Sequence, residues 1–210
     1  MAKTKTILFV CTGNTCRSPM AEALAKDYLA KNGTNPTQDK NIDAAQDKDQ
    51  EVVSLRILSA GLSTYPDMPP SPPAQTVMSE LGLDISQHRC RLLTEELLRE
   101  ADLVLTMTTS HKYYVEEMLK FINQEDEETE VAPQVSLLKE YALDDKAQKQ
   151  ENNTQENNTQ EINNTLGNNK QDILDPFGQS VEAYRACAQE LSHYIQLALA
   201  KFMASLSNKN

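Results

Sequence analysis

Cys11 and Arg17 lie six positions apart in the stretch VCTGNTCRSPM, which follows a short apolar run. A thiolate can act as a nucleophile, and a guanidinium can bind two phosphate oxygens at once, which a lysine cannot. A loop that curls between them could direct backbone N–H groups at an oxyanion, and a following helix N-terminus would add a favourable dipole. The same field would stabilise the thiolate of Cys11. These residue types at this spacing predict a cysteine nucleophile that attacks phosphorus.

Two cysteines in one loop, Cys11 and Cys16, could also form a disulfide or bind a metal. The apolar run before them is too short for a signal peptide, and no stretch approaches the roughly 20 apolar residues of a membrane helix. We therefore expect a cytoplasmic protein, not bound to membranes, whose four cysteines are thiols. No cluster has metal-ligand spacing, so neither a metal nor another cofactor is expected.

The overall charge bears on the partners of the chain. A formal net charge of -11 argues against nucleic-acid binding, because nucleic-acid-binding domains are usually basic. At 210 residues the chain is long enough for one domain with a sizeable core. We expect a monomer.

The residues around the two cysteines predict a loop between a strand and a helix. Residues 6–10 form a continuous apolar run, which is typical of a strand buried on both faces of a parallel sheet. Ser18 could cap a helix with Pro19 in its first turn, or its hydroxyl could contact the sulfur of Cys11. Gly13 would permit a turn that other residues would strain. The helix has apolar residues at helical spacing: Met20, Ala23, Leu24 and Tyr28.

Strands and helices alternate along the rest of the chain. Further strands are predicted at Val52–Ser59, Asp102–Met107 and Gln134–Leu138. Further helices are predicted at Ser71–Gly82, at Thr94–Glu100, through Tyr114, Met118 and Phe121, and at Ser180–Ser205. This alternation predicts an α/β fold: a single domain, residues 1–210, whose four-stranded, mostly parallel sheet has helices on both faces.

Two polar stretches do not fit this alternation. Residues 35–50 have no clear pattern, and residues 144–171 contain the near-repeat NNTQENNTQEINNT. Such composition cannot bury enough apolar surface to offset chain entropy. We interpret both stretches as flexible surface insertions within the domain.

The segment CTGNTCRSPMAEA resembles the phosphate loop and following helix of the low-molecular-weight protein phosphatases. That family also has a late Asp-Pro whose aspartate is the general acid, and DPFG at Asp175–Gly178 lies just before the last predicted helix. SAG from Ser59 and HRCRLLTEE from His88 match further landmarks of the family. The resemblance covers nearly the whole chain apart from the two insertions.

The resemblance implies a role for each residue of the site. Cys11 would attack phosphorus and form a phosphocysteine, Arg17 would bind the phosphate, and Asp175 would protonate the leaving group and then activate water. Ser59 and His88 would support the loop. Cys16 would form a reversible disulfide with Cys11 under oxidation. The implied substrate-binding residues are Thr12, Gly13, Asn14, Thr15, Cys16, Ser18 and Phe177.

Thr15 bears on the substrate, which would be a phosphorylated protein. Tyrosine phosphatases of this family usually have isoleucine there, whereas threonine resembles the bacterial protein-arginine phosphatases. A threonine is shorter and offers a hydroxyl to a guanidinium. Phe177 and Thr108 also depart from the tyrosine-directed pattern, which often has Asp-Pro-Tyr and Met-Asp. The resemblance therefore implies hydrolysis of phosphoarginine in proteins, with a tyrosine phosphatase as the alternative.

Other classes of function and the other thiols and histidines have simpler interpretations. A non-catalytic phosphate-binding or redox-sensing module would keep the same fold. Arsenate reductases that resemble this family carry a further pair of redox cysteines in mid-chain, where this chain has only Cys90. We interpret Cys90 and Cys187 as structural thiols, and His111 and His193 as ordinary helix residues.

Overall fold

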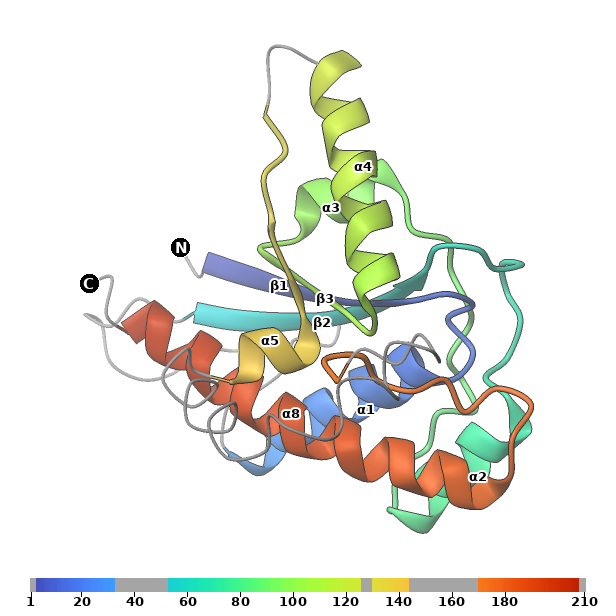
Figure 1. Cartoon of the computed structure of the whole chain (residues 1–210). Coiled ribbons are helices and arrows are strands. Elements are labelled where there is room, and N and C mark those ends of the chain that lie inside the picture. The colour runs from blue at the N-terminus through green and yellow to red at the C-terminus, as the bar shows by residue number, and fades with distance from the viewer. Residues whose placement is uncertain (1–2, 33–52, 126–129, 144–169, 208–210) are drawn as a thin grey trace, which may run out of the picture.

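Four strands pair into one parallel sheet in the computed structural model (Figure 1). The strand order is β2-β1-β3-β4, and every pair in it is parallel. The strands are β1 (Lys3–Cys11), β2 (Val53–Gly61), β3 (Leu103–Thr106) and β4 (Gln134–Leu137). The structure describes residues 3–32, 53–125, 130–143 and 170–207. The predicted four-stranded α/β fold is confirmed, and its sheet is parallel throughout these residues.

Helices cover both faces of this sheet because the side chains of β1 alternate between two apolar clusters. Ile7 and Phe9 pack on one side against four helices, and Leu8 and Val10 pack on the other side against two. The two sets of helices lie on opposite sides of the sheet (Figure 1). The first set is α1 (Arg17–Lys31), α2 (Pro72–Glu80), α5 (Leu138–Ala142) and α8 (Val181–Ser207). The second set is α3 (Glu95–Glu100) and α4 (Thr109–Glu125).

The parallel arrangement brings the carboxyl ends of three strands to one edge of the sheet. Cys11 at the end of β1 pairs with Gly61 at the end of β2, and Val10 pairs with Thr106 at the end of β3. Loops that follow such strand ends form the binding crevice of open α/β sheets. The loop after Cys11 and the segment after Met107 therefore lie beside each other.

One helix was not predicted, and another forms where it was predicted. The short helix α5 was not predicted, because its five residues follow β4 directly and are too few to show a helical period. Helix α4 forms as predicted, but Tyr114 and Phe121 are 59% and 60% exposed. The core side of α4 instead carries Val115, Leu119 and Ile122.

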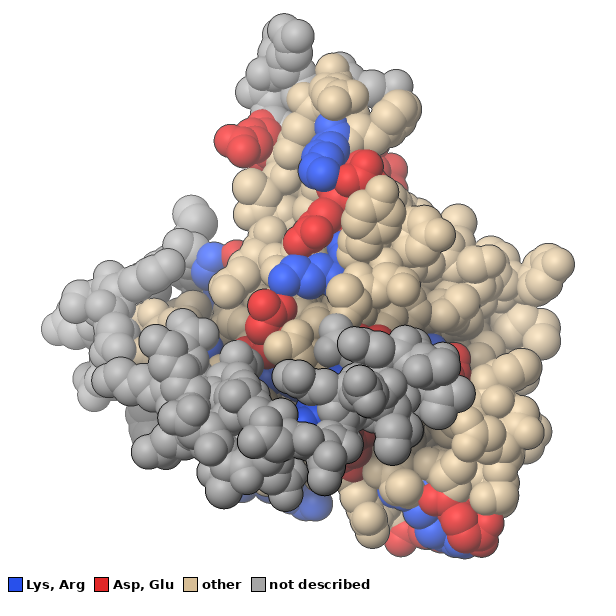
Figure 2. Space-filling view, viewed as in Figure 1, with Lys and Arg blue, Asp and Glu red and all other residues tan. Residues whose placement is uncertain are grey.

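The two predicted insertions lie outside the described residues, except for Lys170 and Gln171, which form a turn. Within the described parts of the chain, no helix combines the length and the apolar character that crossing a membrane requires. Acidic and basic side chains lie close together along α4 (Figure 2). Lys120 pairs with Glu117, and Lys112 pairs with Glu140 of α5. Exposed pairs of this kind contribute about 0–1 kcal/mol to stability.

Candidate active site

The loop from Cys11 to Arg17 connects the end of β1 to the start of α1. Neighbouring segments hold its carbonyl oxygens from outside. The carbonyl of Cys11 accepts the N–H of Leu62 at 3.0 Å, and that of Thr12 accepts the N–H of Ser63 at 2.9 Å. The carbonyl of Thr15 accepts the N–H of Ser71 at 2.8 Å. The carbonyl of Asn14 accepts a bond from the thiol of Cys90 at 2.8 Å. This arrangement leaves the N–H groups of the loop available to an anion.

The sharp turn of the loop occurs at Asn14, which has a φ of 52° in the left-handed region. Asparagine tolerates this region better than most residues. Gly13, the predicted turn residue, has no positive φ. The glycine that the loop requires is Gly61 on the adjacent strand. A Cβ there would lie 2.7 Å from the carbonyl oxygen of Thr12, so only glycine lets the loop approach this closely.

Asn14 is fully buried and holds the loop from behind through its side chain. Its Nδ2 donates to the hydroxyls of Ser18 at 2.9 Å and Ser59 at 3.0 Å. Its Oδ1 lies 3.2 Å from Nε2 of His88 and accepts the N–H of Arg91 at 3.0 Å. The two predicted loop-support residues, Ser59 and His88, therefore both contact Asn14.

The sulfur of Cys11 is almost fully buried and lies 3.0 Å from the hydroxyl of Ser18. This contact explains why Ser18 is not the N-cap that its position before a proline suggests. Helix α1 begins at Arg17 with Cys16 as its N-cap residue, and the Ser18 hydroxyl turns toward the sulfur. A hydroxyl at this distance can donate to a thiolate.

Arg17 joins this loop to the segment that contains Asp175. Its guanidinium is buried, with Nη2 2.5 Å from Oδ2 of Asp175 and Nη1 donating to the carbonyl of Ile173 at 3.2 Å. Within the described residues, Nε of Arg17 is buried and has no hydrogen-bond partner. One guanidinium N–H is therefore free to bind an anion, while the acid holds another.

A cavity of about 210 Å³ lies over the loop. The predicted nucleophile, phosphate ligand and acid meet in it, although the acid lies 164 positions from the nucleophile in the sequence. Asn14 and Ser18, also predicted to bind substrate, are buried behind the loop and do not line the cavity. The lining residues are Cys11, Thr12, Gly13, Thr15, Cys16, Arg17, Asp175 and Phe177.

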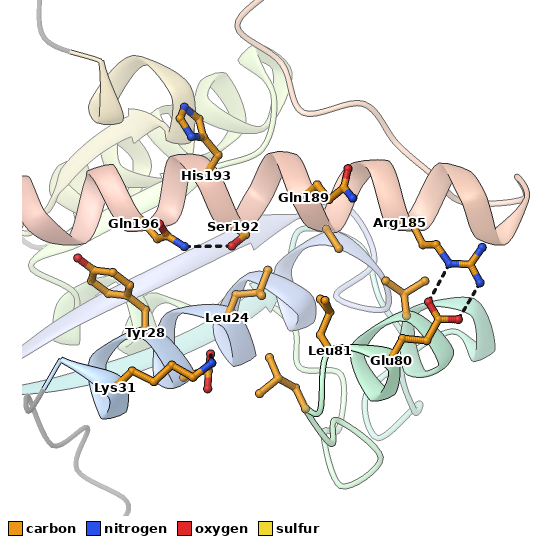
Figure 3. Close-up of a pocket in the computed structure, with 14 residues that line it drawn as sticks. Leu24, Tyr28, Lys31, Glu80, Leu81, Arg185, Gln189, Ser192, His193 and Gln196 are labelled. Atoms are coloured by element: carbon orange, nitrogen blue, oxygen red, sulfur yellow. Dashed lines mark hydrogen bonds and ion pairs between the residues drawn. The ribbon is translucent and has the colours of Figure 1, made fainter.

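A second cavity of about 690 Å³ lies between α1, α2 and α8 (Figure 3). It shares no lining residue with the cavity over the loop. Its charged side chains are paired with one another: Arg185 donates to both carboxylate oxygens of Glu80 at 2.7 Å, and Lys31 to Asp27 at 2.7 Å. This cavity takes no part in the phosphate site.

The remaining thiols lie in different surroundings. Cys16 is buried and donates to the hydroxyl of Ser71 at 3.3 Å, and its sulfur lies 3.2 Å from the hydroxyl of Tyr184. Burial raises the pKa of the Cys187 thiol to about 12 and also raises the pKa of Cys90. Both groups therefore stay protonated near neutral pH. The proposed disulfide between Cys16 and Cys11 stays a prediction.

His111 belongs to the site, although we interpreted it as an ordinary helix residue. It lies in the first turn of α4, is 5% exposed, and places Nε2 2.8 Å from the hydroxyl of Thr12. Burial, followed by the positive charge of Arg17, lowers its pKa to about 4. The only sequence signal was its place just after the strand next to β1. The contact itself spans 99 positions and has no local pattern.

The lowered pKa of His111 predicts how stability depends on pH. Well above pH 6.5, the ordinary pKa of histidine, His111 is neutral in both the folded and the unfolded state. As the pH falls toward 4, only the unfolded state binds the proton, so the folded state loses stability. Between pH 7 and pH 4, we expect the free energy of unfolding to fall by about 3 kcal/mol more in the parent than in His111→Gln. Urea unfolding measures the difference, and the exposed His193→Gln is the control, which should behave as the parent does.

No group of three or more metal-binding side chains is placed to hold an ion in the parts of the chain described. Residues 6–45 and 39–156 match the model of a family described as low molecular weight phosphotyrosine protein phosphatase. The chain belongs to this family. Membership makes it a cysteine-based phosphatase, with the loop from Cys11 as its phosphate site.

Individual members of the phosphatase family resemble this chain over different lengths. The protein-arginine-phosphatase of Bacillus subtilis is 32% identical over 190 residues, 90% of this chain and 91% of that protein. The solved YwlE arginine phosphatase from Geobacillus stearothermophilus has a TM-score of 0.65 at 26% identity, covering 98% of this chain and 97% of that chain. The probable tyrosine phosphatase EpsP of Ralstonia nicotianae is 36% identical over 53% of this chain and 61% of its own length.

Proposed function

We propose that this phosphatase hydrolyses phosphoarginine in proteins through a phosphocysteine. The observation that carries the proposal is that Cys11, Thr15, Arg17 and Asp175 line one small cavity. A relative that matches 90% of this chain is named a protein-arginine-phosphatase, which supports the same substrate.

In the first step, the thiolate of Cys11 attacks phosphorus and the P–N bond breaks. Asp175 gives its proton to the departing guanidine nitrogen. The phosphate oxygens bind the N–H groups of the loop and the free Nε of Arg17, which stabilise the charge of the transition state. The phosphate also competes with Asp175 for Nη2 of Arg17, and so releases the carboxyl group toward the leaving group.

In the second step, water attacks the phosphocysteine. The carboxylate of Asp175 takes a proton from this water, the P–S bond breaks, and inorganic phosphate and the Cys11 thiolate are released. The hydroxyl of Ser18, 3.0 Å from the sulfur, donates to the thiolate as it leaves. The thiolate of Cys11 and the protonated form of Asp175 are thus both regenerated, which completes the cycle.

Thr15 supports phosphoarginine as the substrate. It is half-buried at the cavity, and its hydroxyl lies close to Gly13, where an added Cβ would lie 3.3 Å away. An isoleucine would add a methyl group to this crowded wall and would offer no polar atom. A threonine leaves room for the flat guanidinium and presents an acceptor to its N–H groups.

A tyrosine phosphatase is the second candidate, and the exposure of the Phe177 ring fits it, although the family's tyrosine-directed members often have tyrosine at this position. This ring is 70% exposed at the cavity, where it could contact an aromatic substrate. EpsP, a relative named as a probable tyrosine phosphatase, matches 53% of this chain. The two candidates share Cys11, Arg17 and Asp175 and differ only in the leaving group.

Thr15→Ile tests the choice between them. On matched phosphoarginine and phosphotyrosine peptides, we expect the parent to have the higher kcat/KM for phosphoarginine. The variant should lose about tenfold to a hundredfold of that preference, the usual range for a change in one pocket contact. Thr15→Val separates the hydroxyl from the bulk, because it removes the oxygen at nearly constant shape. A parent that prefers phosphotyrosine would contradict the arginine proposal while leaving the catalytic groups in place.

A further inference from the structure

The segment that ends in Asp175 is fixed three residues earlier, at Asp172. The Oδ1 atom of Asp172 accepts the backbone N–H of Thr109 at 2.8 Å and its hydroxyl at 2.9 Å. Thr109 is the first residue of α4, whose own first turn contains no acidic residue. Asp172 therefore supplies, from a distant segment, the negative charge and the acceptor that a helix N-terminus favours.

Lys139 of α5 holds the backbone of the same residue. It is 8% exposed, and its Nζ donates to the carbonyl oxygens of Asp172 at 2.9 Å and Lys170 at 3.3 Å. Its charge is paired with Glu190 of α8 at 2.5 Å. A buried, paired lysine that bonds two carbonyls fixes the start of this segment against two helices.

Ile173, the next residue, is bound on both sides. Its N–H donates to the carbonyl of Met107 at 2.8 Å, and its carbonyl accepts from Arg17. Asp175 has fewer restraints: its side chain is 47% exposed and contacts Arg17 and the N–H of Phe177. The carboxyl group of Asp175 thus lies at the end of a short segment, residues 172–175, that is held in place at Asp172.

We propose that Asp172 is a positioning residue for the general acid, an inference that rests on the role proposed for Asp175. The first turn of α4 bonds Asp172 through Thr109 and bonds Thr12, next to the nucleophile, through His111. The first turn of α4 therefore sets the distance between the loop that contains Cys11 and the segment that contains Asp175. Loss of the bond to Asp172 leaves the nucleophile in place and displaces the acid, and small displacements of this kind cost up to about a hundredfold in rate.

A series of aryl phosphates with leaving groups of decreasing acidity tests this role. Values of kcat/KM report the attack of Cys11, and only the poorer leaving groups need a proton donor in that step. In Asp172→Ala we expect kcat/KM to fall by about tenfold to a hundredfold for the poorest leaving group and by less than about threefold for the best. In the Asp175→Asn background the same change should add little, because residues that act through one group are not additive.

Two controls separate positioning from a general loss of stability. Asp102 also accepts a backbone N–H, that of Thr6 at 2.9 Å, at the start of β3, so Asp102→Ala should lower activity on all leaving groups equally or not at all. Thr109→Val removes the hydroxyl that bonds Asp172 and should repeat the effect of Asp172→Ala in weaker form. Thr109→Ser keeps the hydroxyl and should retain the parental kcat/KM. This pair decides the question if Asp172→Ala does not fold.

The outcomes distinguish the two proposals. The positioning role is overturned if kcat/KM in Asp172→Ala and Thr109→Val falls equally for all leaving groups, or does not fall, while the loss in Asp175→Asn grows as the leaving group becomes poorer. If Asp175→Asn itself shows no such sensitivity, the role of Asp175 as the acid fails, and the positioning role fails with it.

Discussion

Replacing Cys11 with serine is expected to lower kcat/KM on phosphoarginine peptides by about 10⁴-fold or more. A hydroxyl is a far weaker nucleophile than a thiolate, and the Asp175 carboxylate at the same cavity is already engaged by Arg17. The Ser18 hydroxyl and the loop would remain, so phosphate binding should persist. The expected product is a folded protein that binds phosphate and does not turn over.

The measurement compares initial rates and binding of inorganic phosphate in Cys11→Ser and the parent. Cys187→Ala is the matched control, because it also removes a buried thiol but lies on α8 and does not line the cavity. It should retain the parental rate. Equal hydrolysis by Cys11→Ser and the parent would contradict the enzymatic mechanism and favour a module that only binds phosphate or senses oxidants.

The parts of the fold with strong local patterns were predictable. Residues 6–10 are apolar throughout, as a strand covered on both faces must be, and the strand forms the centre of the sheet. Ser71-Pro72 marks the start of α2, and the Thr94 side chain accepts the N–H of Leu97 at the start of α3. In each case the physical cause lies within a few residues, so the sequence displays it.

Features that depend on distant contacts were not predictable. The core face of α4 could not be assigned, because apolar and aromatic residues at helical spacing do not show which of them face solvent, as Tyr114 and Phe121 do. His111 and Asp172 gain their surroundings only when α4, the loop of Cys11 and the segment before Asp175 meet. The loop turn was assigned to Gly13 from conformational freedom alone, although Asn14, whose side chain makes four hydrogen bonds, adopts the left-handed conformation.

Asp175→Asn is expected to slow hydrolysis of phosphoarginine peptides by about 10²–10⁴-fold, the usual contribution of a general acid. An amide cannot give a proton to the departing guanidine nitrogen or take one from the attacking water. The variant also removes the carboxylate that binds Nη2 of Arg17, which frees that N–H for the phosphate. Inorganic phosphate should therefore inhibit the variant at least as strongly as the parent.

These two effects in opposite directions distinguish loss of the acid from damage to the site. Damage would weaken phosphate binding and turnover together, whereas loss of the acid slows turnover and leaves or improves binding. Steady-state rates on phosphoarginine peptides and inhibition constants for inorganic phosphate, measured for Asp175→Asn and the parent, give both quantities. An unchanged rate on phosphoarginine would remove Asp175 from the mechanism, because a P–N bond with so basic a leaving group cannot break at the parental rate without a proton donor.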